Sequence, residues 1–242
     1  MDAELGALLW MLVEARTPVV VAGQPGGGRG LVASALLDAL PRGTRVQVVD
    51  PADEFAWMPE AVELGWRAAV HAASNPPDRL AAAGGVLHVR NLADAERAGV
   101  TGERARIVVR ALALGYGMVA TMPGRRLEDV LDRLNEPAIG TDEDERSRLG
   151  VVLVLGAREA GAPVPARVEA AHYVRPLAYD THHHVQRLPP AALTTWNATS
   201  GRWDHFAWGV LADLGGRTGL RPVVFEREQA ARASALATLA SC

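Results

Sequence analysis

The pattern of apolar and polar residues along the first 156 positions predicts a series of helices and strands. Leucines recur at helical spacing between 3 and 15, so this segment is predicted to form an amphipathic helix that ends before Pro18. The next run, 18–22 (PVVVA), is short and rich in β-branched residues, which favours a strand. It leads into a glycine-rich turn, and 31–40 is predicted to be the following helix.

Five further apolar runs predict the rest of a sheet. They are 45–50 (RVQVVD), 68–72, 85–90 (GVLHVR), 117–122 (GMVATM) and 151–156 (VVLVLG). Helical patterns around 94–114 and 125–135 separate the later runs. Near-continuous apolar strands that alternate with helices pack as a parallel sheet covered on both faces. Residues 1–157 are therefore predicted to form a P-loop-like α/β core.

The pattern changes after about residue 157. Short strands are predicted at 167–175, 185–188 and 193–196, and helices at 205–214 and 222–240. Residues 158–242 are therefore predicted to form a small β-meander and helical subdomain that packs on the core. The stretch 157–166 (AREAGAPVPA) is the predicted boundary.

The turn GQPGGGRG is the most informative local feature. The candidate phosphate-binding residues are Gly23, Gly26, Gly27, Gly28, Arg29 and Gly30. A functional P-loop reads G-x-x-x-x-G-K-[ST], in which backbone N–H groups wrap the phosphates, the lysine reaches the terminal phosphates and the hydroxyl binds Mg²⁺. Here Arg29 replaces the lysine and Gly30 replaces the hydroxyl residue. Spacing alone also allows a plain strand-to-helix turn, but the position between a strand and a helix favours descent from a P-loop.

The amino-acid composition excludes several kinds of catalysis, binding and cross-linking. All 25 positively charged side chains of the 242-residue chain are arginines, so Schiff-base catalysis, a lysine general base and an ordinary P-loop lysine are excluded. The net charge of −3 gives no basic field, and nucleic acid is not expected as a partner. The single cysteine, Cys242, cannot form an intramolecular disulfide.

Longer stretches of the chain carry a family resemblance. They are LLWMLVEARTPVVVAGQPGGG, ALLDALPRGTRVQVVDPADEF, GYGMVATM, RLEDVLDRLNEPAIG, LGVVLVL and TTWNATSGRWDHF. Together they resemble the RecA-like motor domain of the type II/IV secretion ATPases, which drive pili, archaella and secretion systems. The resemblance extends over nearly the whole chain, although none of the family's motifs is intact.

Compared with that family position by position, this chain lacks several catalytic groups. In the acidic box after the second strand, Val49 and Asp50 stand where the family has Glu beside Asp, so Asp50 is the residual acid. Residues 90–91 (RN) stand where the family has Gly-Glu, whose carboxylate polarises the attacking water. The family's histidine motif, ATIHA, is replaced by ATMPG at 120–124.

These losses predict a catalytically impaired, pseudo-ATPase subunit or scaffold. Phosphoryl transfer depends on cation-mediated charge stabilisation, and each lost electrostatic contact slows it by a factor of roughly 10² or more. ATP or ADP binding is expected to be weak or absent, Mg²⁺ binding is in doubt, and no catalytic residue or protein-bound metal site is assigned. Two alternatives stay open: a weak ATPase that uses Arg29 and borrows catalytic groups from neighbouring subunits, and a protein-binding module without nucleotide.

The resemblance also implies partners and a location. Ring assembly as a homo- or hetero-oligomer, hexameric in the family, is expected, with an intact ATPase paralogue and a membrane platform protein as partners. No apolar run reaches membrane-spanning length, and 5–13 lacks a basic leader, so neither a signal peptide nor a span is predicted. The expected location is the cytoplasm, including the inner face of the cell membrane.

Three further groups of residues are interpreted as structural. The tract His182-His183-His184 is read as a solvated turn rather than a metal site, because neighbouring residues of an extended segment point to opposite sides. Asp53 and Glu54 are read as solvated loop acids. The tryptophans Trp196, Trp203 and Trp208 are expected on strand, turn and helix, packing the C-terminal part rather than forming a ligand platform.

Overall fold

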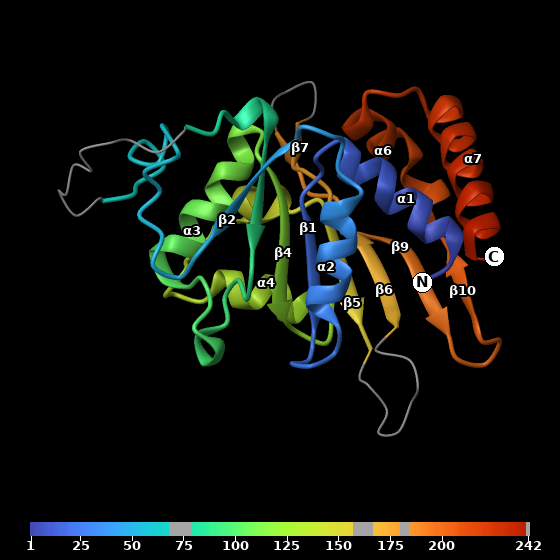
Figure 1. Ribbon diagram of the computed structural model, residues 1–242, viewed down its shortest axis with the longest axis horizontal. Coiled ribbons are helices and arrows are strands. Elements are labelled where there is room, and N and C mark those ends of the chain that lie inside the picture. The colour runs from blue at the N-terminus through green and yellow to red at the C-terminus, as the bar shows by residue number, and fades with distance from the viewer. Residues whose placement is uncertain (68–78, 157–166, 180–183, 241–242) are drawn as a thin grey trace.

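The computed structural model describes residues 1–67, 79–156, 167–179 and 184–240. Its centre is one eight-stranded sheet with the strand order β10-β9-β6-β5-β1-β4-β3-β2. Helices cover both faces (Figure 1). This is an α/β fold with a mostly parallel sheet and a C-terminal β and helical extension, as the sequence predicts. The predicted strand 68–72 and the boundary segment 157–166 lie outside the described residues.

Five neighbouring strands of the sheet are parallel and come from the first 156 residues. They are β1 (Val19–Gly23), β2 (Arg45–Val49), β3 (Gly85–Val89), β4 (Gly117–Pro123) and β5 (Val151–Leu155). β1 pairs with β4 on one side and β5 on the other, while β3 lies between β4 and β2. β1 and β5 are buried at every position, which explains their unbroken apolar sequences.

Three antiparallel strands from the C-terminal part continue the same sheet beyond β5. They are β6 (Val168–Tyr173), β9 (Ala191–Asn197) and β10 (Arg202–His205), and each pairs with the strand before it in the sheet. A separate pair joins β7 (Ala178–Tyr179) to β8 (Val185–Gln186). The division into a core at 1–157 and a subdomain at 158–242 stays a prediction.

The helices pack in two layers. α1 (Ala3–Glu14), α2 (Arg29–Asp38), α6 (Leu211–Thr218) and α7 (Pro222–Ala240) lie in front of the sheet in Figure 1. α3 (Gly102–Ala111), α4 (Leu127–Asn135) and the short α5 (Glu143–Ser147) lie behind it. In the described part of the chain, no helix is both long and apolar enough to span a bilayer.

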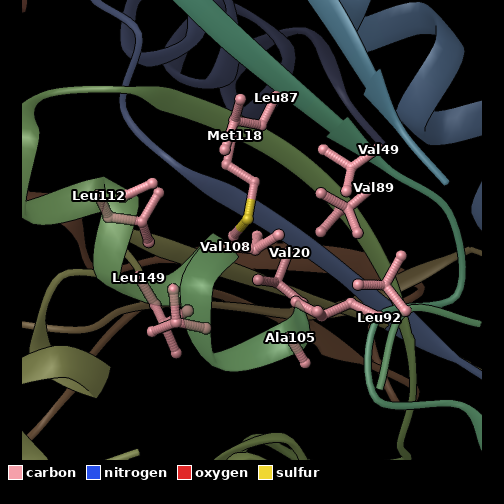
Figure 2. Packing of buried hydrophobic residues seen from close by; sticks show 14 of the residues in the cluster. Val20, Val49, Leu87, Val89, Leu92, Ala105, Val108, Leu112, Met118 and Leu149 are labelled. Carbon is pink, nitrogen blue, oxygen red and sulfur yellow. The ribbon is translucent and has the colours of Figure 1, made fainter. Parts of the chain in front are cut away.

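Alternating side chains of β1 supply two separate cores. Val19 and Val21 belong to the core under α1, α2, α6 and α7, whereas Val20 belongs to the core on the α3 side. Figure 2 shows part of the second core, in which Val108 of α3 and Met118 of β4 lie near Val20. Because both faces of the central strands are buried, the loops at their carboxyl ends are held on a rigid edge.

Candidate functional site

The glycine loop joins β1 to α2 at the carboxyl edge of the parallel strands. Gly26 and Gly28 have φ angles of +77° and +85°, a region that glycine adopts at little cost. The N–H of Gly27 donates to the carbonyl of Gln24 at 3.1 Å. Gly28 is the N-cap of α2, and no side chain caps that helix. The local geometry is a tight strand-to-helix turn whose conformation requires its glycines.

Arg29 points into the protein rather than lying on its surface. The stem of Arg29 passes close to β1, since a Cβ atom placed on Gly23 would lie 3.3 Å from Arg29 Cγ. Its Nη2 atom lies 3.7 Å from Oδ2 of Asp94, and the two side chains are only 7% and 6% exposed. The residue at the P-loop lysine position is therefore held in an internal ion pair.

This ion pair is only partly satisfied. Arg29 Nη1 and Asp94 Oδ2 have no hydrogen-bond partner within the described residues. Burial lowers the pKa of Arg29; the charge of Asp94 acts against this effect, and the charge of Arg97 adds to it. Each charge is thus stabilised mainly by the other, and removing either one would leave an uncompensated charge in the interior.

Asp94 is presented by a tightly constrained loop after β3. Asn91 and Ala93 have φ angles of +53° and +55°, which is costly for alanine because its Cβ crowds the backbone. The Asn91 N–H donates to Thr121 Oγ1 at 2.9 Å, and the Gly99 N–H donates to the Asp94 carbonyl at 2.9 Å. The loop cannot relax without breaking these bonds, so Asp94 stays opposite Arg29.

A cleft of about 450 Å³ opens beside the glycine loop. Its lining residues are Gly26, Gly28, Arg29, Gly30, Ser34, His88, Arg90, Asn91 and Thr121. These nine residues include two arginines and no carboxylate, so they do not fit Mg²⁺, which prefers carboxylate and phosphate oxygens. Burial lowers the pKa of His88 and the neighbouring Arg90 lowers it further, which favours a neutral imidazole in this cleft.

A second cleft of about 600 Å³ is lined by Asp94 but not by Arg29. It is bounded by Gly23, Gln24, Asp94 and the loop and helix at 123–139. With its amide oxygen facing Arg125, Gln24 accepts hydrogen bonds from Nε and Nη2 of that arginine at 2.8 Å each. The interaction fixes the beginning of the glycine loop against the residues that follow β4.

The remaining acids of the sequence-predicted box are not gathered at this site. Asp50 is exposed at the end of β2 and lines neither cleft. Glu54 is exposed in a loop, as expected for a solvated acid, whereas Asp53 is partly buried and departs from that interpretation. Asp53 Oδ1 accepts from the Phe55 N–H at 2.7 Å, and Glu54 pairs with Arg104 at 2.6 Å. These contacts hold the loop 50–67 in place, where the backbone forms neither helix nor strand.

The structure assigns the three C-terminal tryptophans to different surroundings. Trp203 lies on β10 rather than in a turn, and its ring contacts Trp196 edge-on at 4.5 Å. Trp208 is 73% exposed, so the expectation that it packs the C-terminal part was wrong. His182 and His183 of the histidine tract lie outside the described residues. In the described ranges, no group of three or more His, Cys, Asp or Glu side chains is arranged to hold a metal ion.

The Arg29–Asp94 pair is the relationship that sequence reasoning missed. Spacing along the chain does not predict this pair, because Arg29 and Asp94 are distant in the sequence. The signal that could have identified it is an acid in the loop after β3, next to a P-loop that carries arginine in place of lysine.

Comparisons with known proteins give a likeness in structure but none in sequence. No protein-family model and no curated protein matches the chain. Among solved structures, the chain is similar to the crystal structure of the VirB11 ATPase from the Brucella suis type IV secretion system in complex with sulphate. The sequence identity is 16% and the TM-score is 0.44, over 68% of this chain and 50% of that chain. The chain thus spans half the length of that structure's chain, and a likeness at this level carries no argument about activity.

Proposed function

We propose that this chain is a RecA-like subunit of a secretion- or pilus-type assembly that has lost ATP hydrolysis and acts as a scaffold. The observation that carries the proposal is the buried pair between Arg29 and Asp94. A P-loop lysine works by extending over the loop toward the terminal phosphates. Arg29 instead has its charge neutralised by an internal acid, so its guanidinium is not available to a nucleotide without breaking that pair.

The other parts of the cleft support the same proposal. Gly30 has no side chain to hold Mg²⁺, and the residues that line the cleft include no acid to orient a water molecule. Positioning and charge stabilisation supply most of the catalysis in phosphoryl transfer. With the cation ligand, the lysine and the water-orienting acid all missing, hydrolysis at an appreciable rate is not expected, and nucleotide binding is expected to be weak or absent.

The partners follow from the sequence resemblance and are part of the proposal. A non-catalytic subunit of this kind would assemble with copies of itself or with an intact ATPase paralogue, in a hexameric ring as in the family it resembles. It would work in the cytoplasm, at a platform protein on the inner face of the membrane.

Thermal unfolding with and without millimolar Mg²⁺-ATP or Mg²⁺-ADP tests the nucleotide part of the proposal. A ligand at 100 times its Kd stabilises a protein by about 2.7 kcal/mol, which corresponds to a Tm shift of about 5–10 °C for a chain of this size. We expect a much smaller shift and no phosphate release above the rate without protein. Gly28→Glu is the control, because it places a carboxylate in the loop where phosphate would bind.

Each result has a distinct meaning. Metal-dependent ATP hydrolysis that disappears in Gly28→Glu would contradict the proposal and support the weak-ATPase alternative. A nucleotide-dependent shift without hydrolysis would support a scaffold regulated by nucleotide. No shift in either protein would support a scaffold whose interactions are wholly with other proteins.

A further inference from the structure

A groove separate from the glycine loop lies where three helical segments meet. The beginning of α1, the short helical turn Ala207–Val210 that leads into α6, and α7 come together in front of β9 and β10 (Figure 1). The groove has a volume of about 500 Å³. Its lining residues are Glu4, His205, Ala207, Trp208, Leu211, Glu226, Gln229, Ala230 and Ala233.

One face of α7 forms a side of this groove. Residues 226, 229, 230 and 233 follow the spacing of a single helix face, and the alanines among them leave room between α7 and Leu211. These small side chains leave space at the wall of the groove that side chains of another molecule can fill.

The exposed indole of Trp208 stands in the same groove. Trp208 is 73% exposed, whereas Trp57 and Trp66 are buried in the α3-side core. Neither a hydrogen bond nor a ring contact to Trp208 is present among the described residues. A large apolar ring that stays exposed to water does not stabilise the folded chain. Tryptophan is also among the residues most enriched in binding hot spots.

The charged groups of the groove are acidic. Glu4 and Glu226 line it, and His205 is held between Asp2 and Glu4, with Nε2 at 2.8 Å from Asp2 Oδ2. The chain carries 25 arginines, yet none of the nine lining residues is an arginine. On the other side of α7, Arg232 is paired with Glu14 and stacked on Trp10. The groove therefore combines negative charge with an unoccupied aromatic face.

We propose that this groove docks a segment of a partner protein that presents an arginine or lysine beside apolar side chains. The cation would stack on the Trp208 ring and lie near the carboxylates of Glu4 and Glu226, while its stem and the neighbouring apolar residues would cover Leu211 and the alanines of α7. Charge complementarity identifies the partner surface as basic. The inference does not depend on the nucleotide proposal, because no residue of the groove lines either cleft at the glycine loop.

Binding of two fluorescent peptides to the full chain tests this inference. The probe is a basic amphipathic peptide of sequence LRALARLLRAL, and its counterpart has every arginine replaced by glutamate. We expect saturable binding of the basic peptide that weakens with added salt, and no binding of the acidic peptide. Trp208→Ala should weaken the basic peptide's binding about tenfold or more, and Glu226→Gln should weaken it by a smaller factor.

Two control variants distinguish docking in the groove from nonspecific electrostatic or hydrophobic binding. Leu239→Ala removes an equally exposed apolar side chain of α7 outside the groove, and Glu63→Gln removes an exposed acid elsewhere. Both should bind like the unchanged chain. Equal binding of the two peptides, or equal loss in the controls and in Trp208→Ala, would overturn the inference. It would also be overturned if light scattering showed self-association abolished by Trp208→Ala, because the occupant would then be a second copy.

Discussion

The guanidinium of Arg29 and the carboxylate of Asp94 form an ion pair at 3.7 Å, with side chains that are 7% and 6% exposed. The pair joins the first residue of α2 to the loop after β3, at the carboxyl edge of the sheet. In a parallel α/β sheet this edge is where ligands normally bind. Here a charge pair belonging to the protein occupies part of that edge.

Removing one partner of the pair should destabilise the fold. Asp94→Ala leaves the Arg29 charge buried and uncompensated, and we expect a loss of about 3 kcal/mol in the free energy of unfolding. The measurement is urea denaturation followed by circular dichroism. Asp144→Ala is the control, since its partner Arg148 is closer, at 2.8 Å, but both side chains are far more exposed. That variant should lose less than about 1 kcal/mol.

Replacing both partners by apolar residues should cost little. Arg29→Met combined with Asp94→Leu removes the two desolvated charges together, and buried pairs replaced in this way often leave stability unchanged or improve it by about 1–4 kcal/mol. The double variant should therefore unfold at a urea concentration close to that of the unchanged chain. A double variant as unstable as Asp94→Ala would show that the pair contributes more attraction than its burial costs.

Two glycines of the loop should respond in opposite directions to alanine. Gly28 has a φ angle of +85°, so Gly28→Ala should lose about 1–2 kcal/mol from steric crowding of the added Cβ. Gly30 lies within α2, and a Cβ there meets no atom within 4 Å. Gly30→Ala should gain about 0.8 kcal/mol from helix propensity. Thermal unfolding of the two variants measures both effects, and a stabilising Gly28→Ala would contradict the observed turn.

Tyr116 should make stability depend on alkaline pH. Its hydroxyl donates to the Leu80 carbonyl at 2.6 Å, and burial together with the nearby Glu60 carboxylate raises the pKa of Tyr116 to about 12. A raised pKa in the folded state favours the neutral phenol, so its contribution is complete below the ordinary pKa of about 10 and disappears as pH rises through 12. The free energy of unfolding should fall by about 2 kcal/mol across this range.

Because of the composition of the chain, few other side chains titrate in the pH range of this measurement. The chain has no lysine, so the other side chains whose ordinary pKa lies between about 8 and 11 are two tyrosines and one cysteine. Tyr116→Phe should start from a lower stability at pH 8, because the Leu80 carbonyl loses its donor, and its stability should change less between pH 10 and 12. Parallel curves for the two proteins would show that another group causes the pH dependence.

His88 should titrate below the ordinary histidine range. Burial is the larger cause of its lowered pKa, and the charge of Arg90 is the smaller one. The neutral imidazole therefore contributes stability that is fully present above about pH 6.5. That stability is lost as pH falls through the pKa of His88 in the folded state. NMR titration of the imidazole should show Arg90→Gln raising the pKa only in part. Arg202→Gln, an exposed change on β10, should leave it unmoved. Full recovery of the ordinary value in Arg90→Gln would make charge, rather than burial, the main cause.

Local sequence patterns were sufficient for most elements of the fold. The runs at 18–22, 45–50, 85–90, 117–122 and 151–156 each formed a strand, because their apolar, β-branched residues favour extended backbone. All but the edge strand at 45–49 are largely buried on both faces. The missed elements are short. α5 is a five-residue helix that begins with a capping box between Asp142 and Glu145, and β10 is a four-residue strand that alternates exposed and half-buried residues.

The sequence by itself determined the strand–turn–helix at the glycine loop, the missing lysine and hydroxyl, and the α/β class, because these depend on residues close together in the chain. The tertiary structure alone decided that Arg29 is buried against Asp94 and that Trp208 stands exposed in an acidic groove. Both depend on segments brought together by the sheet and its helices. The energy of a charge or an indole is set by its neighbours and its contact with water, which spacing along the chain does not specify.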